Sequence, residues 1–205
     1  MLVFYKERLV FLSVPKTGTT AYQTALAPHA DIVVSDPPIL KHAPVYRYNR
    51  FFRPMFEKAC NVEMELLAVM REPVSWLGSW YRYRQRPFMK GNPNATFDLS
   101  FDDFVQGYIK GRKPAYADVG SQAKFLEPHP SGCHVTHLFR YEDQSGLRAF
   151  LEDRLDLSIS LGAENVSPKL PLDLSPDTRA ALLRKCSQEF DLYNSIPVRG
   201  DPDDI

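Results

Sequence analysis

Residues 11–20, which read Phe-Leu-Ser-Val-Pro-Lys-Thr-Gly-Thr-Thr, combine a cation, a glycine and several hydroxyl groups at one strand-to-helix junction. The apolar start predicts a strand that ends before Pro15, and the residues from Gly18 onward predict a helix. The first amides of a helix have no intrahelical partner and lie at the positive end of its dipole, so they attract a phosphate or a sulfate. The segment therefore predicts an anion-binding loop with five candidate contacts: Lys16, Thr17, Gly18, Thr19 and Thr20.

The order of these residues argues against the nucleotide-binding loop of kinases and ATPases. That loop needs a glycine at its start and a lysine after its second glycine. In this chain Lys16 precedes Gly18, and residues 1–17 contain no glycine. A loop long enough to wrap a β-phosphate and present a magnesium ligand is therefore not expected.

A second junction of this kind lies in residues 66–81, Leu-Leu-Ala-Val-Met-Arg-Glu-Pro-Val-Ser-Trp-Leu-Gly-Ser-Trp-Tyr. The apolar run predicts a buried parallel strand, and Pro73 suits the first position of the helix after it. Arg71 would lie at the carboxyl end of the strand, where its guanidinium can engage two phosphate oxygens while the Ser79 hydroxyl takes another. Taken alone, Arg71 could equally form an ion pair with Glu72, and Ser79 could face solvent. Two such junctions in this order favour anion binding.

Together these two segments resemble the donor site of sulfotransferases that use 3′-phosphoadenosine 5′-phosphosulfate (PAPS). In that family P-K-T-G-T-T is a typical form of the loop that binds the 5′-phosphosulfate. The pattern R-[DE]-P with a serine eight residues after the arginine is similar to the family's 3′-phosphate site, above all in its Golgi and bacterial carbohydrate-type branch. The resemblance implies a P-loop-like fold, PAPS as the sulfuryl donor and no metal. The sequence agrees, since it has no H-E-x-x-H or C-x-x-C motif.

The resemblance implies an enzyme that transfers a sulfuryl group from PAPS to a hydroxyl acceptor, either a carbohydrate or a small metabolite. Negative charge builds on the leaving oxygen in such a transfer, so a nearby cation lowers the barrier, and Lys16 is the candidate. Two alternatives stay open. One is a P-loop-like kinase that uses a nucleoside triphosphate. The other is a non-catalytic protein that binds PAPS or its desulfated product, 3′-phosphoadenosine 5′-phosphate (PAP).

A general base must take the proton of the acceptor, and histidine is the side chain best suited to this near neutral pH. His42 is the candidate because it follows the second predicted strand, where loops at the carboxyl ends of a parallel sheet surround the ligand. Related sulfotransferases are similar here, with a K-H-A segment like residues 41–43. The other histidines are expected to be structural or to lie in turns: His29, His129, His134 and His137.

The resemblance extends to two further segments. Residues 139–143 are similar to an R-Y-E-D element, which we expect to pack and form hydrogen bonds near the site. Residues 165–169 correspond to an N-x-S segment near the nucleotide, which makes Ser167 and Lys169 candidate donor contacts. A polar loop with a solvated lysine is an equally good interpretation of that segment. Residues 121–122 could also face the ligand.

Alternating strand and helix patterns predict an α/β fold, and the resemblance implies a P-loop-like central parallel β-sheet flanked by helices on both faces. The predicted strands cover residues 8–14, 31–35, 65–70 and 133–139. The predicted helices cover residues 18–27, 73–86, 101–111, 119–127, 145–155 and 176–193. The last of these carries a predicted core stripe of Leu183, Cys186, Phe190 and Tyr193. Residues 87–96 are rich in proline and asparagine and predict a lid or a loop on the acceptor side.

The 205 residues are 44% hydrophobic and 24% charged, which predicts one domain over residues 1–205 with a frayed acidic tail at about 200–205. Basic and acidic residues number 25 each, so the net charge gives no reason to expect nucleic acid or an anionic membrane as a partner. Neither a signal peptide nor an apolar run of roughly 20 residues is found. We therefore expect a cytoplasmic protein whose partner is a small-molecule or saccharide acceptor, in an oligomeric state that the sequence leaves open.

Overall fold

The computed structural model describes residues 1–162 and 172–197, which fall into two compact units. Of the described residues, 1–71, 122–162 and 195–197 belong to the first unit, and 72–121 and 172–194 belong to the second. Each unit has a hydrophobic core of its own. The single domain predicted over the whole chain stays a prediction.

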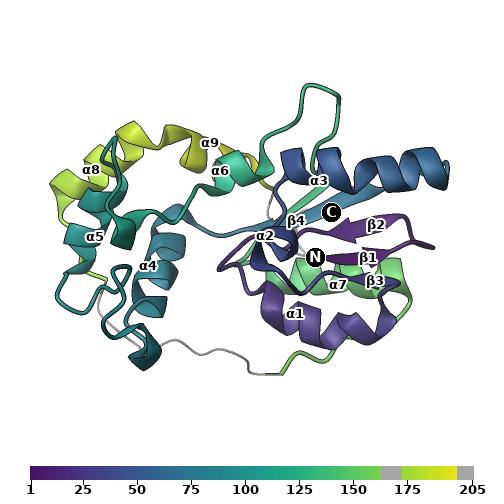
Figure 1. Ribbon diagram of the computed structural model, residues 1–205, viewed down its shortest axis with the longest axis horizontal. Coiled ribbons are helices and arrows are strands. Elements are labelled where there is room, and N and C mark those ends of the chain that lie inside the picture. The colour runs from purple at the N-terminus through teal and green to yellow at the C-terminus, as the bar shows by residue number, and fades with distance from the viewer. Residues whose placement is uncertain (163–171, 198–205) are drawn as a thin grey trace, which may run out of the picture. The chain divides into compact units, whose positions relative to one another are not determined.

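The first unit is built on a mixed β-sheet, which among the described residues has five strands in the order β3-β1-β2-β4-β5 (Figure 1). Strands β2, β4 and β5 run parallel, whereas β1 is antiparallel to both β2 and β3. The predicted α/β class is confirmed, and the predicted parallel arrangement holds for these three neighbouring strands. The strands are β1 (Leu2–Phe4), β2 (Leu9–Phe11), β3 (Ile32–Val33), β4 (Glu65–Met70) and β5 (His137–Arg140).

The antiparallel strand β1 was not predicted, and its pairing follows from the short connection to β2. A parallel crossover needs a dozen or more residues, so the turn at residues 5–8 permits only a hairpin. The turn is closed by a hydrogen bond from the Arg8 amide to the Tyr5 carbonyl at 3.2 Å. A wholly parallel sheet is therefore wrong for this end of the molecule.

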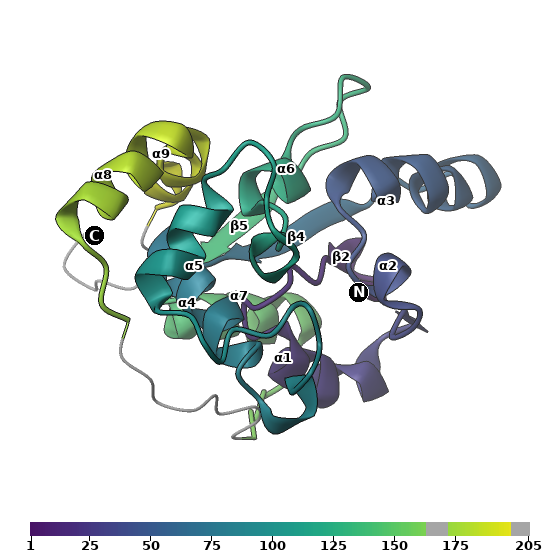
Figure 2. The same ribbon diagram turned by 60° about the vertical axis from the view of Figure 1, so that its left-hand side comes forward.

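The core of the first unit forms where two helices cover one face of the sheet. Helices α1 (Thr19–Leu26) and α7 (Gln144–Leu155) contribute Leu26 and Leu147 to a cluster that includes Leu67 and Val69 of β4. The alternate residues of β4 are also buried, as expected for a strand covered on both faces. Figures 1 and 2 show α3 (Val45–Phe51) on the opposite side of the sheet from α1.

Several short helices lie in the first unit, most of them outside the predicted helices. Besides α3, these are α2 (Pro38–Lys41), a 3₁₀ turn (Ala27–His29), a π-helical turn (Met55–Ala59) and α6 (Gln122–Leu126). Prolines occupy the first positions of the 3₁₀ turn and α2, where their missing amide costs no hydrogen bond. These elements are too short to show a helical period, so the sequence predicted only α6 among them.

The second unit is helical in its described residues, and its core contains Trp76, Phe104 and Leu182. The Glu72 carboxylate caps α4 by accepting from the amides of Val74 and Ser75, at 3.1 and 2.7 Å. Ser100 and Ser175 cap α5 and α8 by accepting from the amides of Asp103 and Thr178. The elements are α4 (Pro73–Tyr83), α5 (Phe101–Tyr108), α8 (Pro176–Lys185), α9 (Ser187–Ser195) and 3₁₀ turns at Pro87–Met89 and Ala115–Ala117.

The prediction of one long helix over residues 176–193 is wrong. The chain breaks between α8 and α9 at Cys186, whose φ of −123° and ψ of 33° leave the helical region. Residue spacing across the break therefore no longer marks one face. Of the predicted stripe, Cys186 and Phe190 pack against the core as predicted. Leu183 does not, since it is 44% exposed, while its neighbour Leu182 is 1% exposed and fills the core.

Candidate functional site

The candidate site lies where the parallel strands of the first unit end. The loop at residues 12–18 follows β2, Arg71 follows β4, and Tyr141 follows β5. Hydrogen bonds from the Leu12 amide to the Leu67 carbonyl (2.8 Å) and from the Tyr141 amide to the Met70 carbonyl (2.7 Å) extend the pairing past the strands. Since the three strands are adjacent, both predicted anion-binding segments meet at this carboxyl edge of the sheet.

The loop after β2 has an unusual backbone that a threonine holds in place. Thr17 is 1% exposed, and its hydroxyl donates to the Val14 carbonyl at 2.9 Å. Lys16 has a φ of 67° and Gly18 a φ of 73°, so two residues of this tight loop adopt left-handed conformations. Such a φ is uncommon and costly for lysine, and strain of this kind concentrates at functional sites. Thr17 therefore shapes the loop through its hydroxyl.

Helix α1 begins directly at the loop without a capping side chain. Gly18 occupies the N-cap position and, having no side chain, makes no cap hydrogen bond to the first amides. Thr19 is buried at 6% exposure, and Thr20 is exposed. The amides of this first turn lack intrahelical carbonyl partners, so the helix start is suited to an anion.

Tyr141 contacts both predicted anion-binding segments. A Cβ atom at Gly18 would lie 2.8 Å from Cε2 of the Tyr141 ring, so glycine is required there by space as well as by its φ. The Arg71 guanidinium carbon lies 4.4 Å from the centroid of the same ring, a cation–π contact. Tyr141 therefore joins the loop after β2 to the arginine after β4.

The backbone of Arg71 is fixed by a buried glutamine. The Arg71 amide donates to Oε1 of Gln122 at 2.9 Å, and Nε2 of Gln122 donates to the Arg71 carbonyl, also at 2.9 Å. Gln122 is 1% exposed and opens α6. The Gln122 side chain thus pairs with the Arg71 backbone as a neighbouring strand would, just past the end of β4. This pairing fixes the direction of the chain at Arg71.

His42 joins the same loop through its ring. It follows α2, and its Nδ1 lies 2.7 Å from the carbonyl oxygen of Ser13, a residue only 4% exposed. A carbonyl only accepts, so Nδ1 carries the proton and Nε2 is the basic nitrogen of the neutral ring. Burial lowers the pKa of His42, which favours this neutral form. The arrangement provides a base beside the loop.

The remaining predicted contacts are not brought into this site by the described structure of the first unit. Ser79 lies on α4 of the second unit and is 7% exposed, so the alternative of a solvent-facing serine is wrong. Its pairing with Arg71 stays a prediction. Ser167 and Lys169 lie outside the described residues.

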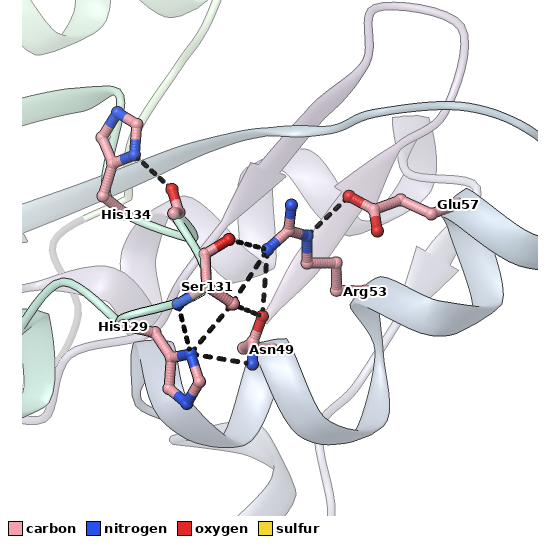
Figure 3. A network of polar contacts seen from close by, with 7 residues as sticks. Asn49, Arg53, Glu57, His129, Ser131 and His134 are labelled. Carbon is pink, nitrogen blue, oxygen red and sulfur yellow. Dashed lines mark hydrogen bonds and ion pairs between the residues drawn. The ribbon is translucent and has the colours of Figure 1, made fainter.

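Two of the other histidines form hydrogen bonds within a loop of the first unit, and His129 also contacts α3 (Figure 3). Nδ1 of His129 accepts from the Ser131 amide and lies within 3.2 Å of Nδ2 of Asn49. Arg53 donates to Ser131 and Asn49 and forms an ion pair with Glu57 at 2.5 Å. The Nδ1 atom of His134 donates to the Gly132 carbonyl at 2.7 Å. These contacts tie the loop together. They match the structural role expected of His134, and a hydrogen bond from the Gly132 amide to the His129 carbonyl at 2.9 Å forms the turn expected at His129.

In the described ranges, no group of three or more His, Cys, Asp or Glu residues is arranged to hold a metal ion. The same ranges contain no helix that is both long and apolar enough to cross a membrane. Comparison of the chain with models of protein families and with curated proteins gives no match. Function must therefore be argued from the residues at the carboxyl edge.

Proposed function

We propose that the chain is a PAPS-dependent sulfotransferase similar to the carbohydrate-type branch, with a P-loop-like fold. The observation that carries the proposal is the position of Tyr141, whose ring contacts both Gly18 and Arg71. These two residues belong to the segments that resemble the 5′-phosphosulfate loop and the 3′-phosphate site. Their proximity supports one ligand with anionic groups at both ends.

The donor would lie along the carboxyl edge of the sheet. The loop amides, Lys16 and the hydroxyls of the first turn of α1 would hold the 5′-phosphosulfate, and Arg71 would hold the 3′-phosphate. Ser79, Ser167 and Lys169 are proposed as further donor contacts. The lysine would stabilise the negative charge that develops on the bridging oxygen as the sulfur–oxygen bond breaks.

The acceptor hydroxyl would attack the sulfur as PAP leaves. His42 would take the hydroxyl proton on Nε2, since its Nδ1 is committed to the Ser13 carbonyl. A new oxygen–sulfur bond forms while the bond to the bridging oxygen breaks, so the transfer needs no covalent enzyme intermediate. Alignment and charge stabilisation by the chain's residues would supply the rate.

Two other functions are weaker candidates. A kinase would need a longer glycine-started loop, whereas here Lys16 precedes Gly18 and Thr17 closes a tight turn onto Val14. A non-catalytic PAP-binding protein would not need a histidine beside the loop. The contact of His42 with Ser13 therefore favours an enzyme.

Calorimetric titration with PAP, beside ATP with magnesium, tests the proposal. We expect PAP to bind without magnesium and Arg71→Ala to weaken it by about 10- to 100-fold, the range for a lost charged hydrogen bond. Arg148→Ala, which changes an exposed arginine of α7, is the matched control and should bind PAP normally. Binding of ATP with magnesium but not of PAP would make the chain a kinase candidate. Binding of PAP without sulfuryl transfer to any hydroxyl acceptor would favour the non-catalytic protein.

A further inference from the structure

A cavity of about 790 Å³ lies in the second unit and is lined mainly by the loop that follows α4. Its volume lies within the range of small-molecule sites, roughly 300 to 1,000 Å³. The cavity is formed by two segments, residues 90–99 and Tyr116, and both belong to the second unit. The side chains that could recognise a ligand are Lys90, Asn92, Phe97, Asp98 and Tyr116.

The first wall, residues 90–99, is anchored to the end of α4 by a buried threonine. Thr96 is fully buried, and its hydroxyl donates to the Tyr81 carbonyl at 3.0 Å. Its amide donates to the Arg84 carbonyl, and its own carbonyl accepts from Nε2 of Gln85 at 3.1 Å. The loop thus has a fixed base although its tip is exposed.

The second wall is held by the same part of α4. The Arg84 side chain is 7% exposed and donates to the carbonyls of Ala115 and Asp118, at 2.8 and 3.2 Å. The ring of Tyr116 packs against Gly107 of α5, where a Cβ atom would lie 2.8 Å from it. Arg84 therefore fixes both walls. Its carbonyl binds the Thr96 amide of the first wall, and its guanidinium binds the carbonyls of the second, so the cavity is preformed.

The lining suits a ligand that is polar but uncharged. Lys90 is positively charged and Asp98 is negatively charged. Lys90 would therefore repel a strongly cationic ligand, and Asp98 would repel a strongly anionic one. The Phe97 ring is 44% exposed and, with Tyr116, offers apolar faces on which the C–H face of a sugar can stack. The Asn92 side chain is oriented by accepting from the Asn94 amide at 2.9 Å. Amide and carboxylate groups beside aromatic rings match the hydroxyls and C–H faces of a sugar.

We propose that this cavity is a binding site for an uncharged saccharide of two or three residues. The site lies wholly in the second unit and contains none of the residues assigned to the sulfuryl donor. It can therefore be tested without PAPS. If the saccharide proves to be the acceptor, the proposed transferase gains a substrate class, but binding does not depend on that activity.

The test is calorimetric titration of the full chain with cellotriose, maltotriose and N,N′,N″-triacetylchitotriose, and with trigalacturonate as a charged probe. We expect at least one neutral trisaccharide to bind and trigalacturonate to bind more weakly. Phe97→Ala should reduce the affinity by about 3- to 10-fold through lost stacking. Asp98→Ala should reduce it by about 5-fold through lost hydrogen bonds.

Phe88→Ala is the matched control, since Phe88 is 64% exposed, packs on Tyr83 and does not line the cavity. It should leave saccharide affinity unchanged. Both test positions are exposed, so their variants should unfold at the same urea concentration as the original chain. Failure of all neutral probes, tighter binding of trigalacturonate, or unchanged affinity in both test variants would overturn the proposal. Loss of PAP binding to the first unit would leave it standing.

Discussion

The two ends of the parallel strands differ in how they hold their charged side chains. At the amino edge, where β4 and β5 begin, Oε2 of Glu65 accepts from Nε2 of His137 at 3.0 Å and from Nη2 of Arg154 at 2.6 Å. At the carboxyl edge, Arg71 instead lies over the ring of Tyr141. The charged side chains at the amino edge are paired with one another, whereas at the carboxyl edge the Arg71 guanidinium packs over a tyrosine ring.

The backbone shows the same difference at the two ends of β2. Arg8, just before the strand, has a φ of 53°, and the hairpin turn that it closes explains this conformation. Lys16, just after the strand, has a φ of 67° in the loop that precedes α1. No hairpin follows Lys16; its loop is held by the hydrogen bond from Thr17 to Val14, and under the proposed function this conformation would serve anion binding. We therefore expect a substitution that relieves the strain at Arg8 to leave function unchanged, whereas a substitution at Lys16 should affect it.

The largest effect on PAP binding should come from Gly18→Ala, which changes the carboxyl edge and leaves the amino edge intact. The new Cβ would meet both a φ of 73° and the Tyr141 ring at 2.8 Å, so we expect PAP binding to be lost in calorimetry. Gly120→Ala is the control, with a φ of 82° but no atom within 4 Å of the added Cβ. Gly120→Ala should lower stability by about 1 to 2 kcal/mol through its φ alone and leave binding intact, whereas Gly18→Ala should lower stability further through the clash and abolish binding. Normal PAP affinity in Gly18→Ala would contradict the role of Tyr141.

Lys16→Gly should separate the backbone strain at Lys16 from the catalytic contribution of its ammonium group. Glycine accepts the left-handed conformation, so stability in urea should rise by up to about 1 kcal/mol. Loss of the ammonium group should lower kcat for sulfuryl transfer by about 100- to 1,000-fold. Arg8→Gly is the matched control, since it relieves a similar φ at the other end of β2 and should gain stability with kcat unchanged. Equal effects of both variants on kcat would remove the distinction between the two ends.

His42 should make the stability of the protein depend on pH. Burial lowers its pKa from the ordinary 6.5, so below pH 6.5 the unfolded chain binds a proton that the folded chain does not. Stability should therefore be complete above pH 6.5 and fall as the pH decreases toward the folded pKa. His42→Gln should remove this slope in urea titrations and lower kcat by about 100-fold.

His134→Gln is the control for that measurement, because His134 also donates from Nδ1 to a backbone carbonyl at 2.7 Å but lies outside the site. It should leave kcat unchanged. A similar loss of activity in both variants would mean that the loss is not specific to the site, and it would no longer support His42 as the base.

Strong local signals made much of this fold predictable. The apolar run at residues 65–70 is β4, and the helix starts at Pro73 and Ser175-Pro176 follow from their caps. Strand β1 was missed because three apolar residues gain their strand conformation only from β2 and β3. The break at Cys186 was missed because the residues on either side have good helical spacing.

The site was predicted as two separate segments, but its connections were not. Tyr141 belongs to a segment expected only to pack nearby, and its contact with Gly18 and Arg71 depends on the order of the strands. Gln122 pairs with the Arg71 backbone across 51 positions of sequence. Contacts of this kind arise from tertiary structure and leave no periodic pattern in the chain.

Gln122→Leu should have an intermediate effect because it acts on Arg71 through the backbone. The variant leaves the Arg71 amide and carbonyl without this partner, so we expect stability in urea to fall by about 1 to 3 kcal/mol. PAP should bind about 10-fold more weakly, while kcat at saturating PAPS should change little. Gln85→Leu is the control, since this half-buried glutamine also donates to a backbone carbonyl, that of Thr96, but belongs to the second unit. Unchanged PAP affinity in Gln122→Leu would mean that the direction of the chain after β4 does not control the site.

The smallest effect should come from the amino edge. Hydrogen bonding from His137, aided by Arg154, lowers the pKa of Glu65, so its contribution to stability is present above its ordinary pKa of 4.5 and is lost as the pH falls below it. The Glu65 side chain is 40% exposed, and screening should limit the stability loss of Glu65→Gln at pH 7 to less than about 1 kcal/mol. PAP affinity should not change, because this cluster lies at the opposite end of the strands from the binding loop. If Glu65→Gln weakened PAP binding as strongly as Gln122→Leu, the two edges would be coupled, and the division between a stabilising end and a functional end would be wrong.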